Sequence, residues 1–146
     1  MNQTLAGILI SFLLVAASLY LHFKALRRGA SRIAHLKVNA RQTMMMIMAV
    51  IFLAHLLEII LFAIVYWLMT VTGLGELSGN HTSTAADFFY FSIATYTTLG
   101  IGDIMPEGAI RLVAGVESLA GLLLIAWSAS FTYLAMERLW TDDLQG

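Results

Sequence analysis

Seven consecutive residues combine the properties needed to bind a bare cation: Thr97, Thr98, Leu99, Gly100, Ile101, Gly102 and Asp103. Glycine accepts backbone torsions that other residues resist. Two glycines that alternate with apolar residues can therefore turn successive carbonyl oxygens toward one side. A row of such carbonyls, contributed by several copies of a chain, can replace the water shell of a cation. The segment predicts a cation-binding loop built from backbone oxygens.

A short apolar segment precedes this loop and predicts the element that positions it. Thr84 and Asp87 fit a capping box, so a helix is expected to begin there. A helix of about 13 residues reaches only about 20 Å, which is too short to cross a bilayer. We expect it to enter the membrane and return by way of the loop, because irregular backbone at that depth is tolerated only where protein or water lines it. The negative end of its dipole would then favour a cation.

The order Thr-Thr-Leu-Gly-Ile-Gly-Asp resembles Thr-Thr-Val-Gly-Tyr-Gly-Asp, the signature of the tetrameric potassium channels, and the likeness runs from Ala85 to the end of the last helix. The resemblance implies a selectivity filter that consists of Thr98, Leu99, Gly100, Ile101 and Gly102. In it, the Thr98 hydroxyl and the first four carbonyls would bind K+, supported by Thr97 and Asp103. The resemblance also implies a homotetramer with no cofactor other than the permeant ion. Ile101 departs from the family pattern, which usually has Tyr or Phe there, and isoleucine can pack behind the filter but cannot hydrogen-bond.

The composition is that of an integral membrane protein. Of the 146 residues, 60% are hydrophobic and 12% are charged, against about half and a quarter in soluble domains. No cysteine is present, so disulfides and thiolate metal sites are excluded. The apolar runs predict an all-α membrane protein with three transmembrane helices and one re-entrant helix. The expected segments are an N-terminal helix (1–23), a basic linker (24–42) and a pore domain (43–146), the last divided into outer helix 43–72, turret 73–84, pore helix and filter 85–103, and inner helix 107–139, which Pro106 would begin.

Basic residues are concentrated in one segment. Six of the eight lie between Lys24 and Arg41, with no acid among them. Such an excess marks the cytoplasmic side, so we expect an outside N-terminus, a cytoplasmic C-terminus and a multi-pass protein of the cell membrane. The segment could contact anionic lipid, and Leu26, Ile33 and Leu36 could let part of it lie flat on the membrane. Lipid, K+ and further copies of the chain are the expected partners, and nucleic acid is not.

The last helix is expected to line the pore. By the resemblance, Gly121 falls at the glycine often called a hinge in the inner helix. A stripe at helical spacing is assigned to the cavity and the inner gate: Leu122, Ile125, Ala129, Tyr133 and Glu137. The alternative is that this stripe is only core between helices.

Two acids fall inside the apolar runs. Glu58 lies three residues after His55, so the two share a helix face. A carboxylate at this depth indicates a functional site, or a protonated acid that hydrogen-bonds a neighbouring helix. Glu117 lies one to two turns inside the outer end of the last helix, where a contact near the pore helix is expected.

Other function classes fit parts of the same sequence. A non-selective cation channel would have the same architecture. Gly100-Ile101-Gly102-Asp103 also fits the Gly-x-Gly-Asp motif of intramembrane aspartyl proteases, which need a second aspartate to share a proton. The other aspartates are Asp87, before the motif, and two near the C-terminus. An accessory subunit that conducts nothing would leave the paired threonines and both glycines unexplained, so a non-enzymatic pore is expected.

Overall fold

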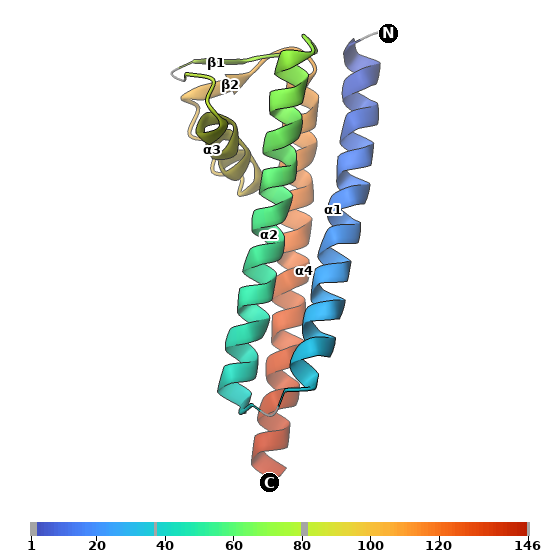
Figure 1. Cartoon of the computed structure of the whole chain (residues 1–146), viewed down its shortest axis with the longest axis vertical. Coiled ribbons are helices and arrows are strands. Elements are labelled where there is room, and N and C mark those ends of the chain that lie inside the picture. The colour runs from blue at the N-terminus through green and yellow to red at the C-terminus, as the bar shows by residue number, and fades with distance from the viewer. Residues whose placement is uncertain (1–2, 37, 80–81, 146) are drawn as a thin grey trace.

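Three long helices run side by side, and a fourth, short helix packs against one end of the bundle (Figure 1). The computed structural model describes residues 3–36, 38–79 and 82–145. The helices are α1 (Gln3–Ala34), α2 (Ala40–Val71), α3 (Ala85–Tyr96) and α4 (Ile110–Gln145). Stretches of α1, α2 and α4 are long and apolar enough to cross a membrane, which confirms the all-helical class with three spans. Lys37, in the basic segment, and Asn80 and His81, in the predicted turret, lie outside the described residues.

The first helix is longer than the apolar run that predicted it. It continues through the basic residues to Ala34, where a helix end was expected near residue 23. Leu26 and Ile33 are buried with Ile47 of α2, because they fall on the side of α1 that faces that helix. These two side chains therefore form core between α1 and α2, and not the apolar face of a segment lying flat on a membrane.

The short helix α3 begins with the predicted capping box. The Thr84 hydroxyl accepts a hydrogen bond from the Asp87 backbone amide, and the Asp87 carboxylate accepts one from the Thr84 amide at 2.9 Å. The Thr84 and Thr82 side-chain hydroxyls also donate to this carboxylate. These hydrogen bonds, led by the Thr84 amide, lower the pKa of Asp87 to about 2. The cap fixes the point at which the chain turns into α3.

Two three-residue strands tie both ends of the loop region together. Strand β1 (Leu77–Gly79) pairs antiparallel with β2 (Ile104–Pro106), with Leu77 opposite Pro106. Pro106 therefore lies in a strand and does not begin the last helix, which starts at Ile110. Between Pro106 and Ile110, Gly108 has a φ of +63°, a torsion that an α-helix does not contain. In Figure 1 the two strands lie at the end of the bundle from which α3 descends.

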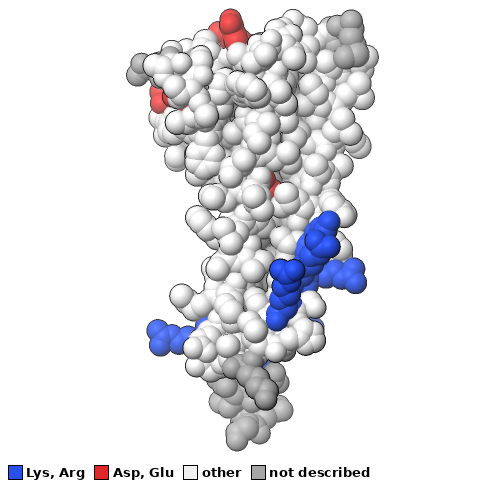
Figure 2. Space-filling view, in the orientation of Figure 1, with Lys and Arg blue, Asp and Glu red and all other residues white. Residues whose placement is uncertain are grey.

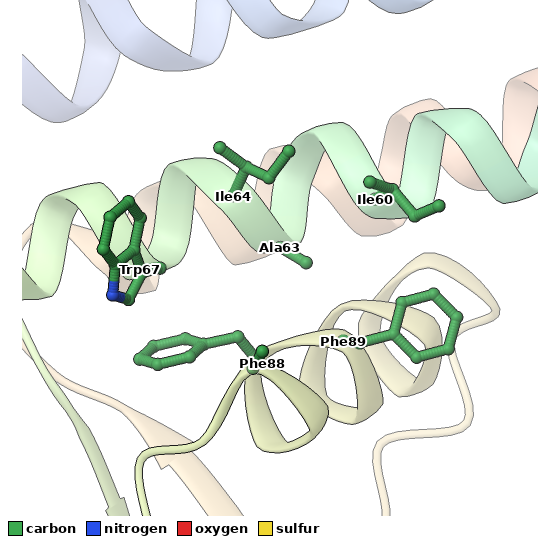
Figure 3. A pocket seen from close by; sticks show the side chains of 7 residues that line it. Ile60, Ala63, Ile64, Trp67, Phe88 and Phe89 are labelled. Carbon is green, nitrogen blue, oxygen red and sulfur yellow. The ribbon is translucent and has the colours of Figure 1, made fainter.

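Aromatic side chains join α3 to the bundle. Phe88 and Phe91 are buried with Phe62 and Tyr66 of α2 and Val113 of α4. An apolar groove of about 280 Å³ remains between α2 and α3. Figure 3 shows Phe88 and Phe89 of α3 on one side of it and α2 on the other. The α2 side is formed by Ile60, Ala63, Ile64 and Trp67. Its all-apolar lining suits contact with lipid or with another apolar surface.

Charged side chains are segregated along the bundle. Figure 2 shows Lys and Arg side chains on the lower half of this face, Asp and Glu at the upper rim, and an almost uncharged band between them. The basic side chains of Arg27, Arg28 and Arg32 are exposed on the lower part of α1. This distribution is that of a membrane protein whose two ends meet different aqueous sides.

Candidate functional site

The loop of residues 97–103 follows α3, and its backbone amides and carbonyls differ in their hydrogen bonding. The Leu99 and Gly100 amides both donate to the Ala94 carbonyl, at 2.9 and 3.2 Å. The Thr97 and Thr98 amides donate to Ile93 and Thr95. Among the hydrogen bonds of the described residues, none ends on a carbonyl of residues 98–101. The amides of residues 97–100 are therefore bonded to α3, while the carbonyls of residues 98–101 remain available for a cation.

Backbone torsions alternate along this loop. Thr98, Gly100 and Gly102 have φ values of +58°, +53° and +86°, so every second residue is left-handed. Glycine adopts this region without steric cost, whereas a β-branched threonine there is strained. The alternation explains why glycines stand two residues apart. The strained torsion of Thr98 is accompanied by hydrogen bonds from its own amide and from the Leu99 amide to α3.

The side chains of the loop are open in the single chain. All seven residues from 97 to 103 are exposed, and Leu99 and Ile101 expose 66% and 57% of their surface. Two large exposed apolar side chains on one loop suit contact with further copies of the chain. The loop borders a pocket that is also lined by Thr95 of α3 and by Ala114 and Ser118 of α4.

A hydrogen bond braces the loop at its far end. The Tyr90 hydroxyl, on α3, donates to Oδ2 of Asp103 at 3.0 Å, and the Ile104 amide donates to Oδ1 at 3.1 Å. Asp103 is thus tied to both α3 and β2. This brace was not predicted for Tyr90, because a separation of 13 positions does not correspond to a contact within one element.

Gly121 lies where α4 approaches the end of α3 most closely. A Cβ added at this position would lie 2.2 Å from the Tyr96 carbonyl oxygen. One turn earlier, the Ser118 hydroxyl donates to the Thr95 carbonyl at 3.0 Å. α4 is a single helix through this point. The structure therefore gives Gly121 a packing role, and the hinge stays a prediction.

Glu117 is fully buried between three helices. The Ser92 hydroxyl of α3 donates to its Oε1 at 2.6 Å, and the Tyr66 hydroxyl of α2 donates to its Oε2. Ser92 also lies 2.9 Å from the Ile59 carbonyl oxygen. The carboxyl group thus contacts α3, as expected from its depth, and links it to α2 and α4.

Glu58 is also fully buried, and it contacts more groups than the sequence indicated. Its Oε2 lies 3.3 Å from Nδ1 of His55, the predicted partner. Its Oε1 lies 2.9 Å from Nδ1 of His22 on α1, and the Tyr96 hydroxyl donates to Oε2 at 2.5 Å. Sequence analysis missed His22 and Tyr96. A histidine at the end of the first apolar run was the signal that could have found the first of them.

The predicted stripe on α4 lies on one exposed side of the helix in the single chain. It consists of Leu122, Ile125, Ala129, Tyr133 and Glu137. Leu124 and Ser128, on the opposite side of α4, are buried against the rest of the chain. The stripe is therefore not core within one chain, and its role as cavity and gate remains a prediction.

A family described as "Ion channel" matches residues 44–138, more than half of the chain. The chain belongs to this ion channel family. The matched region contains α3, the loop and most of α2 and α4, while α1 lies outside it. Membership makes the chain a membrane protein and a non-enzymatic channel. The aspartates agree, since Asp103 bonds Tyr90 and Ile104 whereas Asp87 caps α3, so the two do not share a proton.

Two curated channels share short segments with this one. The potassium voltage-gated channel protein Shal of Drosophila melanogaster is 54% identical over 48 residues, which are 32% of this chain and 8% of Shal. Two-pore potassium channel 1 of Arabidopsis thaliana is 41% identical over 51 residues, 34% of this chain and 14% of that protein. The chain thus matches only a small part of each relative's length. No solved structure matches.

Proposed function

We propose that this chain is the pore-forming subunit of a homotetrameric channel that conducts K+ passively through residues 98–102. The observation that carries the proposal is the division of backbone groups in the loop: four successive amides are bonded to α3, and the carbonyls of residues 98–101 accept no hydrogen bond among the described residues. Carbonyl oxygens of this kind bind cations in selectivity filters. The Thr98 hydroxyl and the carbonyls of Thr98, Leu99, Gly100 and Ile101 would be the K+ ligands.

Assembly follows from the geometry of a single loop. One row of carbonyls cannot surround an ion, so several loops must meet around an axis, and closed symmetry favours a ring of identical subunits. The exposed side chains of Leu99 and Ile101, together with the exposed stripe on α4, support burial between copies. In such a ring, α3 is a re-entrant pore helix whose C-terminal end points to the pore, where its dipole favours a cation.

Orientation in the membrane follows from charge. The basic residues of α1 would face the cytoplasm, which places the N-terminus, the strand pair and the mouth of the filter outside and the C-terminus inside. Glu76, Asp103 and Glu107, exposed at the filter end, would raise the local cation concentration there. The pocket around Lys24, Arg27 and Arg28 would contact anionic lipid headgroups at the opposite interface.

Selectivity for K+ is supported by the names of both relatives and by the motif. The second candidate, a non-selective cation pore, is favoured by one observation: Ile101 cannot make the hydrogen bond that an aromatic hydroxyl makes behind the loop. Against it stands the Tyr90–Asp103 brace, which joins α3 to the end of the same loop. One such hydrogen bond in each subunit would limit collapse of the filter.

Purified channel provides the test. The mass of the detergent complex, corrected for detergent, should equal four chains, and liposomes containing it should release K+ down a gradient. A Thr98→Ala, Gly100→Ala double variant is the matched control, because it alters the proposed ligands and leaves the helices intact. A monomer that conducts, or equal flux through the control, would contradict the proposal.

A further inference from the structure

A closed polar cluster lies in the middle of the bundle, outside the filter. It joins four helices: His22 of α1, His55 and Glu58 of α2, Tyr96 of α3 and Ser128 of α4. His22 and Glu58 have no exposed side-chain surface, and His55 exposes 16%. Because α1 lies outside the matched channel region, His22 is a contact that the common pore architecture does not supply.

Six short contacts connect these five side chains. His22 Nδ1 lies 2.9 Å from Glu58 Oε1, while His55 Nδ1 lies 3.3 Å from Glu58 Oε2 and 2.8 Å from the Tyr96 hydroxyl. The Tyr96 hydroxyl donates to Glu58. On the other side of both rings, Nε2 of His22 and Nε2 of His55 each lie 3.0 Å from the same Ser128 hydroxyl.

Neutral imidazoles supply too few hydrogens for these contacts. A neutral ring carries one N–H, and an ionised carboxylate only accepts. If both Nδ1 atoms donate toward Glu58, both Nε2 atoms are bare, yet Ser128 has a single hydrogen for the two of them. If His55 instead carries its hydrogen on Nε2, its bare Nδ1 faces Glu58 and competes with it for the Tyr96 hydroxyl hydrogen. Each arrangement leaves at least one buried contact between two lone pairs.

One added proton satisfies the whole cluster. His22 then donates from Nδ1 to Glu58 and accepts from Ser128, and Ser128 accepts from Nε2 of the doubly protonated His55. Nδ1 of His55 donates to the Tyr96 oxygen and toward Glu58, and Tyr96 donates to Glu58. The carboxylate and the imidazolium also cancel in charge, which a buried site in an apolar interior requires.

The cluster contains one carboxylate, which balances one positive charge. α2 supplies the only carboxylate among the contacts of the described residues, α1 and α3 supply His22 and Tyr96, and α4 supplies Ser128 and the ring of Trp127, 5.4 Å from His22. The other buried acid, Glu117, is bonded to Tyr66 and Ser92. The ligand atoms of His22, His55 and Glu58 lie within 4.8 Å of one another, which also fits a metal ion, but a divalent ion would leave an excess positive charge where a proton leaves none.

We propose that His22, His55 and Glu58 form a binding site for one proton that couples α1 to the end of α3 and so controls the filter. Tyr96 precedes the loop directly, its hydroxyl lies in the cluster, and its carbonyl lies against Gly121. With the proton bound, Tyr96 is held and the loop keeps the conductive geometry. Loss of the proton leaves an unpaired contact and an unbalanced carboxylate, which loosens Tyr96. Conduction should therefore fall as pH rises. This rests on the proposed function only for the conduction readout.

The first test measures K+ flux from liposomes at several pH values. Histidine ordinarily changes charge between about pH 5 and 8, and flux should fall on the order of tenfold across that range. His22→Gln and His55→Gln, which keep polar side chains that do not titrate, should flatten this dependence. His35→Gln is the matched control, because His35 is exposed beyond the end of α1 and away from the cluster. A dependence that survives both cluster variants would overturn the proposal.

The second test does not need conduction. In assembled channel labelled with 15N-histidine, one ring per chain that is absent from His55→Gln should be doubly protonated near neutral pH. If both cluster rings are neutral and the Glu58 carboxyl group, followed by 13C labelling, is ionised, the proton site is refuted even in a channel that conducts. If the imidazolium is present but neither the unmodified channel nor any variant conducts K+, the proposed function fails and the proton site stands. Displacement of the cluster resonances by zinc chloride at neutral pH would assign the site to a metal and overturn the proton.

Discussion

Replacing Gly100 by alanine tests the backbone requirement of the filter directly. Gly100 has a φ of +53°, and nothing lies within 4 Å of the position that a Cβ would occupy. The effect of a methyl group is therefore torsional strain and not a clash. A non-glycine residue in the left-handed region costs about 1–2 kcal/mol, so four copies around one pore would cost about 4–8 kcal/mol relative to a relaxed loop. If the conductive and relaxed loops are otherwise similar in energy, that shift removes roughly three to six orders of magnitude of conductive population.

The matched control is Gly73→Ala. Gly73 has a φ of +70°, also with nothing within 4 Å of an added Cβ, but it follows α2 and lies outside the loop. Both variants carry similar strain, so both should lower thermal stability by a similar small amount. K+ release from liposomes, normalised to the total released by an ionophore, should be lost in Gly100→Ala and kept in Gly73→Ala. Wild-type release through Gly100→Ala would refute the reasoning, because the conductive loop would then not need a left-handed residue at position 100.

Three further outcomes follow from particular contacts. Gly121→Ala should lower the melting temperature and the flux, since its Cβ would lie 2.2 Å from the Tyr96 carbonyl oxygen. The control Gly115→Ala, where nothing lies within 4 Å of an added Cβ, should match or exceed wild-type stability. Equal melting temperatures of the two variants would argue against close packing at Gly121. The lowered pKa of Asp87, about 2, lies below the usual value of about 3.9, so its contribution to stability is complete above about pH 4 and is lost as pH falls toward 2. Melting of Asp87→Asn in detergent should lack that part of the pH dependence, and an unchanged acid profile would remove the cap from the account. Cysteines introduced at Gln3 and Ser31 of this cysteine-free chain should react from opposite sides of the membrane, and labelling of both from one side would contradict the topology.

The elements that follow from local signals could be predicted. Long apolar runs define α1, α2 and α4, and the capping box of Thr84 and Asp87 defines the start of α3. Gly100 and Gly102 were singled out by type and spacing, and both have the expected left-handed torsions. These features are encoded within a few residues or within one period of a helix.

Features that depend on distant partners were missed. The end of α1 was predicted too early because hydropathy falls at Lys24. The helix continues to Ala34, with Leu26 and Ile33 packed against α2. Pro106 was assigned to a helix start, although its place opposite Leu77 in the strand pair decides its conformation. His22 meets Glu58 across 36 residues, and nothing in either local segment specifies that contact.

The most direct measurement of the central claim is the reversal potential of the reconstituted channel with K+ on one side and Na+ on the other. Backbone oxygens and the Thr98 hydroxyl are the proposed ligands, and the side chain of Ile101 is not among them, so K+ should still be preferred. The account predicts a reversal potential displaced strongly toward the K+ equilibrium potential, with the displacement reduced when Tyr90→Phe removes the brace on Asp103. A reversal potential near zero in the unmodified channel would contradict K+ selectivity.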